Sequence, residues 1–236
     1  MYRMTEKGER IREMFDTIAP RYDFLNRLLS LGIDRRWRRY AVGQLAIPAG
    51  GQVLDIATGT GDVALEIARQ TSSDVTIVGA DISGEMVEIG RQKVAASPFA
   101  SRISFEIAPC EALPFADERF DGITIAFGIR NVVDRQLGLQ EMQRVLKPCG
   151  RAVILEFSIP SNLLFKTIYN FYFLKVLPRL GGLFSKQSAY QYLPDSVLDF
   201  PSRDEFKSMM ATAGFFNIRS TDLTFGIATV YVGDKP

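Results

Sequence analysis

The sequence predicts an α/β fold built on a mostly parallel sheet with helices on both faces. Short apolar runs alternate with segments of helical periodicity from residue 53 to residue 158. The first run, VLDIA, leads into a small loop of glycine and threonine, and a helical pattern starts directly after it. Two further apolar runs, around 215–221 and 225–232, are placed to pair antiparallel at the end of the sheet. In such sheets ligands sit beyond the carboxyl ends of the strands.

Composition narrows the classes of protein to which the chain can belong. Its 236 residues suit one α/β domain with an appended subdomain, and a net charge of +1 gives no argument for nucleic-acid binding. The chain contains no histidine. This absence excludes a histidine general base, a Ser-His-Asp triad and the usual zinc sites, so no metal is expected. Cys110 and Cys149 belong to no metal-spaced motif, and we interpret both as reduced thiols of a cytoplasmic protein.

The N-terminal segment is basic and helical in pattern. Residues 1–40 carry ten Lys/Arg and six Asp/Glu, a net +4 that leaves −3 for the remainder. Ile11, Met14, Phe15 and Ile18 follow helical spacing. A solvated helix face explains the charge most simply, and contact with an acidic substrate or a membrane surface stays open. The first residues show no apolar core of an export signal.

Strands and helices are expected in a regular order. Pro-Ala-Gly-Gly at 48–51 breaks the chain before the first strand. We expect strands at 53–57, 76–81, 103–108, 121–127 and 151–158, and helices from about 62, from about 84, over 134–146 and from about 202. Ser202 and Glu205 have the spacing of a capping box. The predicted parts are a helical cap (1–48), an α/β core (49–160), an aromatic lid (161–200) and a final helix with two strands (201–236).

Residues 161–184 depart from the alternating pattern. They are rich in Phe, Tyr and Leu, but Lys166, Lys175 and Arg179 interrupt them, so we do not expect a transmembrane span. One interpretation is an apolar lid that rests at a membrane interface. The other is an insertion packed into the core, or a contact between the two copies of a homodimer.

The loop after the first strand has the residues that a nucleotide site requires. Gly59 and Gly61 let the backbone turn sharply and approach a ligand, and the following helix offers free N–H groups. Asp81 stands twenty residues after Gly61, at the end of the next strand, where a carboxylate can hold ribose hydroxyls. The predicted binding residues at these two strand ends are Asp55, Thr58, Gly59, Thr60, Gly61, Asp81 and Ile82.

The loop by itself does not decide between two cofactors. GTGDVA at 59–64 also satisfies the G-x-G-x-x-G/A pattern of an NAD-binding oxidoreductase. S-Adenosylmethionine is favoured because Asp55 suits a ligand with an ammonium and a sulfonium better than a pyrophosphate. ALPF at 112–115 and the run after it look like the adenine-side loop and fourth strand of a class I methyltransferase. The chain also offers neither a histidine nor a separate catalytic domain for hydride transfer.

Two longer segments resemble a specific enzyme family. FDTIAPRYDFLNRLLSLGIDRRWRR (15–39) and RVLKPCGRAVILEFS (144–158) resemble the two signatures of the ubiquinone/menaquinone-biosynthesis C-methyltransferases. The likeness covers almost the whole chain, including FGIRN at 127–131. It implies a class I, Rossmann-like fold with seven strands, the last of them antiparallel. It also implies that S-adenosylmethionine methylates a ring carbon of a polyprenyl quinol and leaves as S-adenosylhomocysteine.

The resemblance places cofactor contacts on Thr60, Asp81 and the pair Pro109-Cys110. The family usually has Asn-Ala or Asp-Ala at this pair, so we expect only a main-chain contact there. A serine common after the family's fourth strand is Ala126 in this chain, which removes a side-chain contact.

Two further positions depart from the family signatures. Asp34 stands where the first signature often has histidine, so an essential histidine role at this position is untenable. Cys149 stands where the second has glycine, and we expect it to affect loop geometry only.

Ring methylation requires an electron-rich ring carbon aligned with the methyl group, so the reduced quinol is the expected acceptor. Our catalytic candidates are Arg130, Asn131, Tyr22 and Asn26. Arg130 would stabilise a phenolate or orient a water, and Asn131 would hold that geometry; a loop salt bridge and a helix cap are the competing interpretations. For Tyr22 and Asn26, with Asp23 between them, a structural lid contact is as well supported as substrate contact. Glu156 is interpreted as an ion-pair partner in preference to a base.

The substrate and two rival functions stay open at this stage. Demethylmenaquinol is the first choice of acceptor, and 2-methoxy-6-polyprenyl-1,4-benzoquinol of ubiquinone synthesis is the second. The rivals are an NAD-binding oxidoreductase and a non-catalytic methyltransferase-like scaffold, which the altered positions 109, 110 and 126 motivate. The low net charge speaks against a nucleic-acid methyltransferase. We expect a cytoplasmic protein, with peripheral contact to the inner face of the membrane as a further option.

Overall fold

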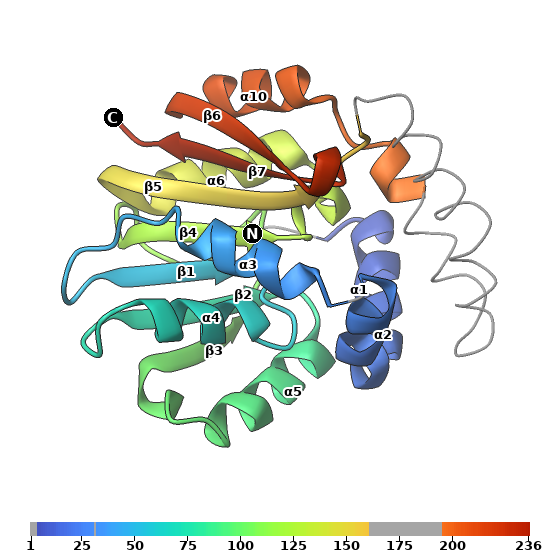
Figure 1. Ribbon diagram of the computed structural model, residues 1–236, viewed down its shortest axis with the longest axis vertical. Coiled ribbons are helices and arrows are strands. Elements are labelled where there is room, and N and C mark those ends of the chain that lie inside the picture. Colours follow the sequence, from blue (N-terminus) through green and yellow to red (C-terminus); the bar gives the residue numbers. More distant parts are fainter. Residues whose placement is uncertain (1–3, 31, 161–194) are drawn as a thin grey trace.

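The molecule is built on a sheet of seven strands. The computed structural model describes residues 4–30, 32–160 and 195–236 (Figure 1). The strand order is β3-β2-β1-β4-β5-β7-β6, and only β7 runs antiparallel to its neighbours. The strands are β1 (Gln52–Ile56), β2 (Thr76–Asp81), β3 (Ile103–Ile107), β4 (Phe120–Ala126), β5 (Leu146–Phe157), β6 (Phe216–Leu223) and β7 (Ala228–Asp234). The predicted seven-stranded, mostly parallel sheet is confirmed.

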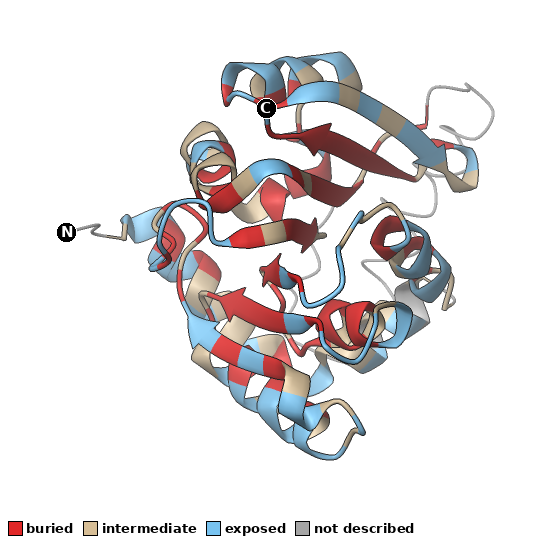
Figure 2. Cartoon of the chain, turned by 90° about the vertical axis from the view of Figure 1, so that its left-hand side faces the viewer, coloured by how far each residue is buried: buried red, intermediate tan, exposed pale blue. Residues whose placement is uncertain are grey.

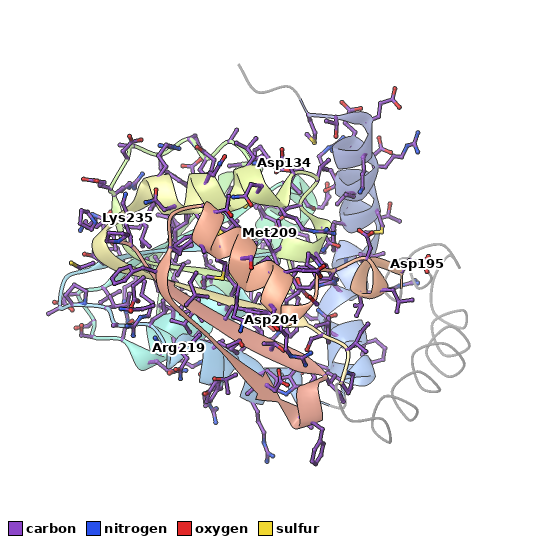
Figure 3. All side chains as sticks on the ribbon, turned by 90° about the horizontal axis from the view of Figure 1, so that it is seen from above. Asp134, Asp195, Asp204, Met209, Arg219 and Lys235 are labelled. Atoms are coloured by element: carbon purple, nitrogen blue, oxygen red, sulfur yellow. The ribbon has the colours of Figure 1, made fainter. Side chains whose placement is uncertain are left out.

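Helices cover both faces of the sheet, as the alternation predicts. α3, α4 and α5 pack on one face, and α6 and α10 pack on the other. Ser202 and Glu205 form the predicted capping box at the start of α10. Figure 3 looks down on α10, where the Met209 carbonyl accepts a 3.4 Å hydrogen bond from Gln136 of α6. The helices are α1 (Glu6–Ile18), α2 (Tyr22–Leu29), α3 (Asp34–Val42), α4 (Asp62–Gln70), α5 (Gly84–Ala95), α6 (Arg135–Val145) and α10 (Arg203–Thr212).

The interior strands are apolar because both of their faces are covered. Every residue of β7 is buried, and so is every residue of β1 after Gln52. Figure 2 shows these buried strands inside a shell of helices with exposed outer faces. Trp37 of α3 packs on β5 and β7, and its indole N–H donates a 2.8 Å hydrogen bond to Thr224. This packing fixes the strand ends from which the functional loops emerge.

The N-terminal helices stand across the carboxyl ends of the strands (Figure 1). Asp16 of α1 accepts a 2.6 Å hydrogen bond from the hydroxyl of Ser83, two residues after β2. Tyr22, the first residue of α2, lies so close to the loop after β1 that a Cβ on Gly59 would be 3.9 Å from its ring. The helical segment therefore covers the end of the sheet where a ligand is expected.

Of the predicted aromatic lid, 161–200, residues 161–194 lie outside the described residues, and with them the Phe-, Tyr- and Leu-rich stretch 161–184, so both of its interpretations stay open. The described chain resumes at Asp195 with a helical turn at 195–198; Figure 3 labels Asp195 near the end of the molecule at which α1 stands. No helix within the described ranges has the length and apolarity needed to cross a bilayer.

One strand starts earlier than predicted. β5 begins at Leu146, not near 151, because Leu146 already pairs with Phe120. The register then shifts, so that Arg151 pairs with Gly122 and residues 147–150 bulge from the ladder. Cys149 lies in this bulge with a φ of 61°. Glycine adopts this left-handed conformation without steric cost, which gives a physical reason for the glycine that the resemblance associates with this position.

We expect Cys149→Gly to stabilise the protein. The substitution removes the clash of a Cβ in left-handed backbone, which costs about 1–2 kcal/mol, and part of this gain is offset by the greater freedom of glycine in the unfolded chain. A net increase of about 0.5–1 kcal/mol in the free energy of unfolding should appear in urea titrations. Cys149→Ala is the control, because it removes the thiol but keeps the Cβ. An equal gain in both variants would show that the thiol, not the backbone, is responsible.

Candidate active site

A cavity lies at the carboxyl ends of β1, β2, β3 and β4, beside α1, and has about 750 Å³ of empty space when the part open to solvent is included. The predicted site residues that line it are Tyr22, Gly59, Asp81, Ile82, Pro109, Cys110, Ala126 and Asn131. The remaining predicted residues, which lie outside its lining, are Asn26, Asp55, Thr58, Thr60, Gly61 and Arg130.

The carboxylate of Asp81 joins the loops after β1 and β2. Its Oδ2 accepts a 2.8 Å hydrogen bond from the N–H of Gly59, and its Oδ1 accepts a 2.9 Å bond from the N–H of Ser83. Gly59 and Gly61 adopt left-handed φ values of 55° and 79°, which turn the loop into α4. Burial raises the pKa of Asp81 to about 6, although the N–H donors oppose the shift. The N–H of Ile82 also donates to this carboxylate. A carboxylate has about four acceptor sites, so one stays available to a ribose hydroxyl.

Asp55 and Thr58 lie beneath the loop and do not reach the cavity. Asp55 is fully buried and accepts hydrogen bonds from the hydroxyls of Thr58, at 2.6 Å, and Thr124, at 2.7 Å. Burial raises the pKa of Asp55 to about 7. The sequence predicts a direct ligand contact for Asp55, but the structure uses both of its oxygens to hold the turn after β1.

Thr60 belongs to an ionic junction that joins α2, α4 and α5. Its hydroxyl donates a 2.6 Å hydrogen bond to Asp23, and the ammonium of Lys93 donates to Thr60 at 2.9 Å and to Asp62 at 2.8 Å. Lys93 also pairs with Asp23. Burial opposes ionisation of Asp62, but Arg38 and Lys93 outweigh it and lower its pKa. The side chain of Thr60 therefore fixes the loop against the N-terminal helices instead of lining the cavity.

The far wall of the cavity carries apolar side chains, main-chain groups and the carboxylate of Glu111. Ile82 follows β2, Pro109 and Cys110 follow β3, and Ala126 ends β4. Burial raises the pKa of the Cys110 thiol far above its usual range, so the thiol stays neutral. The N–H of Cys110 has no acceptor among the described residues. It is free for the main-chain contact that the sequence predicts at this position.

Arg130 forms a buried ion pair. The guanidinium Nη1 of Arg130 lies 2.7 Å from Oε1 of Glu156. The main-chain N–H of Arg130 donates a 3.2 Å hydrogen bond to Oε2 of the same carboxylate. The ion-pair interpretation of Glu156 is therefore confirmed. Arg130 Nη1 also donates to the carbonyl of Phe127, and its guanidinium lies 5.3 Å from the ring centre of Phe157. Its Nε is buried and, among the described residues, has no hydrogen-bond partner.

Tyr22 and Asn26 form a polar pair one helical turn apart. Their side chains are hydrogen-bonded, and burial raises the pKa of the Tyr22 hydroxyl despite this bond. Tyr22 lines the cavity and Asn26 does not. Asn131 lines the cavity from the loop after β4, close to the carbonyl of Phe127.

Sequence reasoning missed much of the cavity wall. Ile11 and Phe15 of α1 face the cavity, as does Phe127 after β4. The helical spacing of Ile11 and Phe15 gave a signal, but spacing does not say which surface an apolar helix face covers. Glu111 also lines the cavity, and no pattern in the sequence singled it out.

A sequence model of the ubiE/COQ5 methyltransferase family matches residues 3–235. The chain belongs to the ubiE/COQ5 methyltransferase family. It is 68% identical, over 100% of both chains, to a Geotalea uraniireducens protein named ubiquinone/menaquinone biosynthesis C-methyltransferase UbiE. A Deinococcus radiodurans protein named demethylmenaquinone methyltransferase is 48% identical over 98% of this chain and 94% of its own. A solved SAM-dependent methyltransferase of Thermotoga maritima has a TM-score of 0.68 and 21% identity over 96% of this chain and 100% of its own, which shows the fold alone.

Membership of the ubiE/COQ5 family decides between the interpretations of the loop at 59–64. The chain is a methyltransferase, so the dinucleotide pattern does not mark an oxidoreductase. The sheet order and the antiparallel β7 agree with the class I, Rossmann-like fold that the resemblance implies. The residues around Asp81 and Cys110 fit S-adenosylmethionine, because they offer an acceptor for a ribose hydroxyl and a free N–H donor for a ring nitrogen.

We predict that S-adenosylhomocysteine binds more weakly as the pH falls below about 6. A ribose hydroxyl of the ligand would donate to ionised Asp81, so a proton on this carboxyl competes with it, and affinity should fall about tenfold per pH unit. Asp81→Asn should bind about 10–100-fold more weakly at pH 7.5, with no dependence on pH in this range. Calorimetric titration between pH 5 and pH 7.5 measures both effects. The same pH dependence in Asp81→Asn would assign the titration to another group.

We predict that Lys93→Met weakens both the fold and cofactor binding. The variant leaves Asp23 and Asp62 without their shared cation, which should cost about 1–2 kcal/mol of unfolding free energy and several-fold in affinity for S-adenosylhomocysteine. Lys147→Met is the matched control, because Lys147 pairs with Asp121 away from the cavity. Urea titration and calorimetry on both variants separate the effects. Unchanged affinity in Lys93→Met would limit the junction to a role in stability.

Proposed function

We propose that the protein transfers a methyl group from S-adenosylmethionine to a ring carbon of a polyprenyl quinol. The observation that supports this most is the composition of the cavity wall. Asp81 and the N–H of Cys110 offer polar contacts beyond β2 and β3, whereas Ile11, Phe15 and Phe127 offer apolar surface from α1 and the loop after β4. The first set suits a nucleoside, and the second suits an aromatic ring with an apolar tail.

The proposed mechanism relies on positioning. When bound, S-adenosylmethionine supplies an electrophilic methyl group on a sulfonium. Asp81 would hold the ribose, and Tyr22 and Asn131 would orient the quinol ring so that its carbon faces this methyl group. Arg130 lies behind the cavity wall, where its bonds to Glu156 and to the Phe127 carbonyl would hold the loop that carries Asn131. Asn131 and the Tyr22 hydroxyl, which line the cavity, would then stabilise the phenolate that forms as the quinol loses a proton. Since the chain has no histidine, a water held beside Asn131 would take that proton. After methyl transfer the methylated ring carbon would release its hydrogen as a proton to water, which restores the aromatic ring, so each turnover adds one methyl group and releases one proton.

We propose demethylmenaquinol as the acceptor, with menaquinol as the product. Relatives from Deinococcus radiodurans and Bacteroides fragilis, 48% and 45% identical, carry the name demethylmenaquinone methyltransferase. Relatives that are 68% identical are named for both ubiquinone and menaquinone biosynthesis, so the methoxy-benzoquinol remains the second candidate.

A polyprenyl acceptor resides in a membrane, so we propose peripheral contact with the inner face of the cytoplasmic membrane. Arg35, Arg36 and Tyr40 are exposed on α3, a basic and aromatic set that suits an anionic lipid surface. The homodimer that the sequence leaves open stays a prediction.

The decisive experiment is transfer of labelled methyl from S-adenosylmethionine to chemically reduced demethylmenaquinone, with the matching methoxy-benzoquinol in parallel. We expect label on the naphthoquinol. Label on both rings would indicate an enzyme of both pathways, and label only on the benzoquinol would reverse the choice of substrate. Label on neither ring, together with tight binding of S-adenosylhomocysteine, would leave the cofactor in place and rule out both quinols as acceptors.

The contribution of Arg130 requires a paired variant. Arg130→Ala alone leaves Glu156 as a buried, unpaired charge and should cost about 3–5 kcal/mol of stability. The double variant Arg130→Gln/Glu156→Gln removes both charges. We predict that its kcat falls about 100-fold while its affinity for S-adenosylhomocysteine changes less than about threefold. Equal losses in kcat and affinity would show that Arg130 supports the cofactor site and not the reacting ring.

A further inference from the structure

Glu111 is a carboxylate in the cavity wall for which neither the family signatures nor the mechanism above provides a role. It follows Cys110 directly, lines the cavity and is only 8% exposed. Its Oε1 accepts hydrogen bonds from the N–H groups of Val133, at 3.0 Å, and Asp134, at 3.4 Å. These donors belong to the loop that links Asn131 to α6, so one oxygen of Glu111 is fixed by the main chain.

The second oxygen of Glu111 has no such partner. Within the described chain, no hydrogen bond reaches Oε2 and no cation forms an ion pair with Glu111. Oε2 is not one of the buried unpaired atoms of the described chain, so it is open to the cavity, where a ligand can reach it. Because Oε1 faces the main chain of the loop after β4 and the residue lines the cavity, Oε2 is available to a donor on the ligand.

Pro109 leaves Glu111 Oε2 as the side-chain acceptor in this part of the cavity wall. Proline has neither a main-chain N–H nor a polar side chain, so position 109 offers no side-chain partner to the ligand. Of the residues 108–111 that line this part of the wall, Glu111 supplies the only carboxylate, and the neighbouring Cys110 supplies a free N–H. One donor and one acceptor on adjacent residues match a ring edge that carries a nitrogen acceptor beside an amino group.

We propose that Glu111 is the residue that makes the site specific for adenine, with Oε2 accepting a hydrogen bond from the 6-amino group of the purine. The N–H of Cys110 would donate to the ring nitrogen next to it. This inference rests on S-adenosylmethionine being the cofactor but does not depend on which quinol is methylated.

The test compares two ligands by calorimetry on the full chain. They are S-adenosylhomocysteine and its 6-deamino analogue, in which purine replaces adenine and the ring nitrogens are unchanged. A hydrogen bond to a charged group predicts that the unaltered protein prefers adenine about 10–100-fold. In Glu111→Gln, the N–H groups of Val133 and Asp134 hold the amide oxygen, so the amide NH₂ faces the ligand. The preference should then fall below about threefold.

Glu141→Gln is the matched control. Glu141 also accepts a main-chain hydrogen bond, from Leu113 at 2.8 Å, but it does not line the cavity, so this variant should keep the full preference for adenine. If Glu111→Gln weakens the binding of both ligands equally, the ratio of the two affinities is unchanged. Glu111 would then have a purely structural role, and the proposal would be overturned. Equal affinity of the unaltered protein for both ligands would overturn it as well. If S-adenosylhomocysteine does not bind the unaltered protein, the proposed cofactor fails along with this inference, whereas binding without methyl transfer affects only the proposed reaction.

Discussion

The hydrogen bonds of Asp81 are the constraint on which the arrangement of the site depends. One carboxylate receives the N–H of Gly59 from the loop after β1 and the N–H of Ser83 from the loop after β2. These bonds hold the two loops against the Asp81 carboxylate, at the adjoining ends of the neighbouring strands β1 and β2. The loop that receives Asp81 turns through the left-handed backbone of Gly59, and Asp55 lies buried beneath it. A ligand that donates to Asp81 therefore meets a group whose position is already determined.

The N-terminal helices complete the site through polar contacts made with the loops. Asp16 bonds to Ser83, and Asp23 bonds to Thr60 and Lys93. The same helices supply apolar side chains to the cavity. The loops after β1 and β2 and this apolar part of the wall are therefore held together by the same contacts. Methyl transfer depends more on the alignment of the two reacting atoms than on proton transfer. A chain without a histidine base can therefore rely on this preorganisation of the site for catalysis.

The sequence predicted the fold well because apolar runs and helical segments alternate with clear breaks between them. It failed at the start of β5, since Pro148, Cys149 and Gly150 suggest a break where the chain bulges and continues in the sheet. Within the site, Gly59 and Asp81 were predictable because their positions at strand ends fix their surroundings. The directions of Asp55 and Thr60 were not, because they depend on Thr124, Asp23 and Lys93, which lie far away in the sequence.

The ionic junction at Lys93 has a consequence for the order in which the molecule assembles. During synthesis α1 and α2 leave the ribosome before their partners Ser83 and Lys93, which lie beyond β2, in the loop before α5 and in α5 itself. Until those segments have been translated, the apolar face of α1 has no surface on which to pack. α1 and α2 are therefore translated before the surfaces to which Asp16 and Asp23 bond.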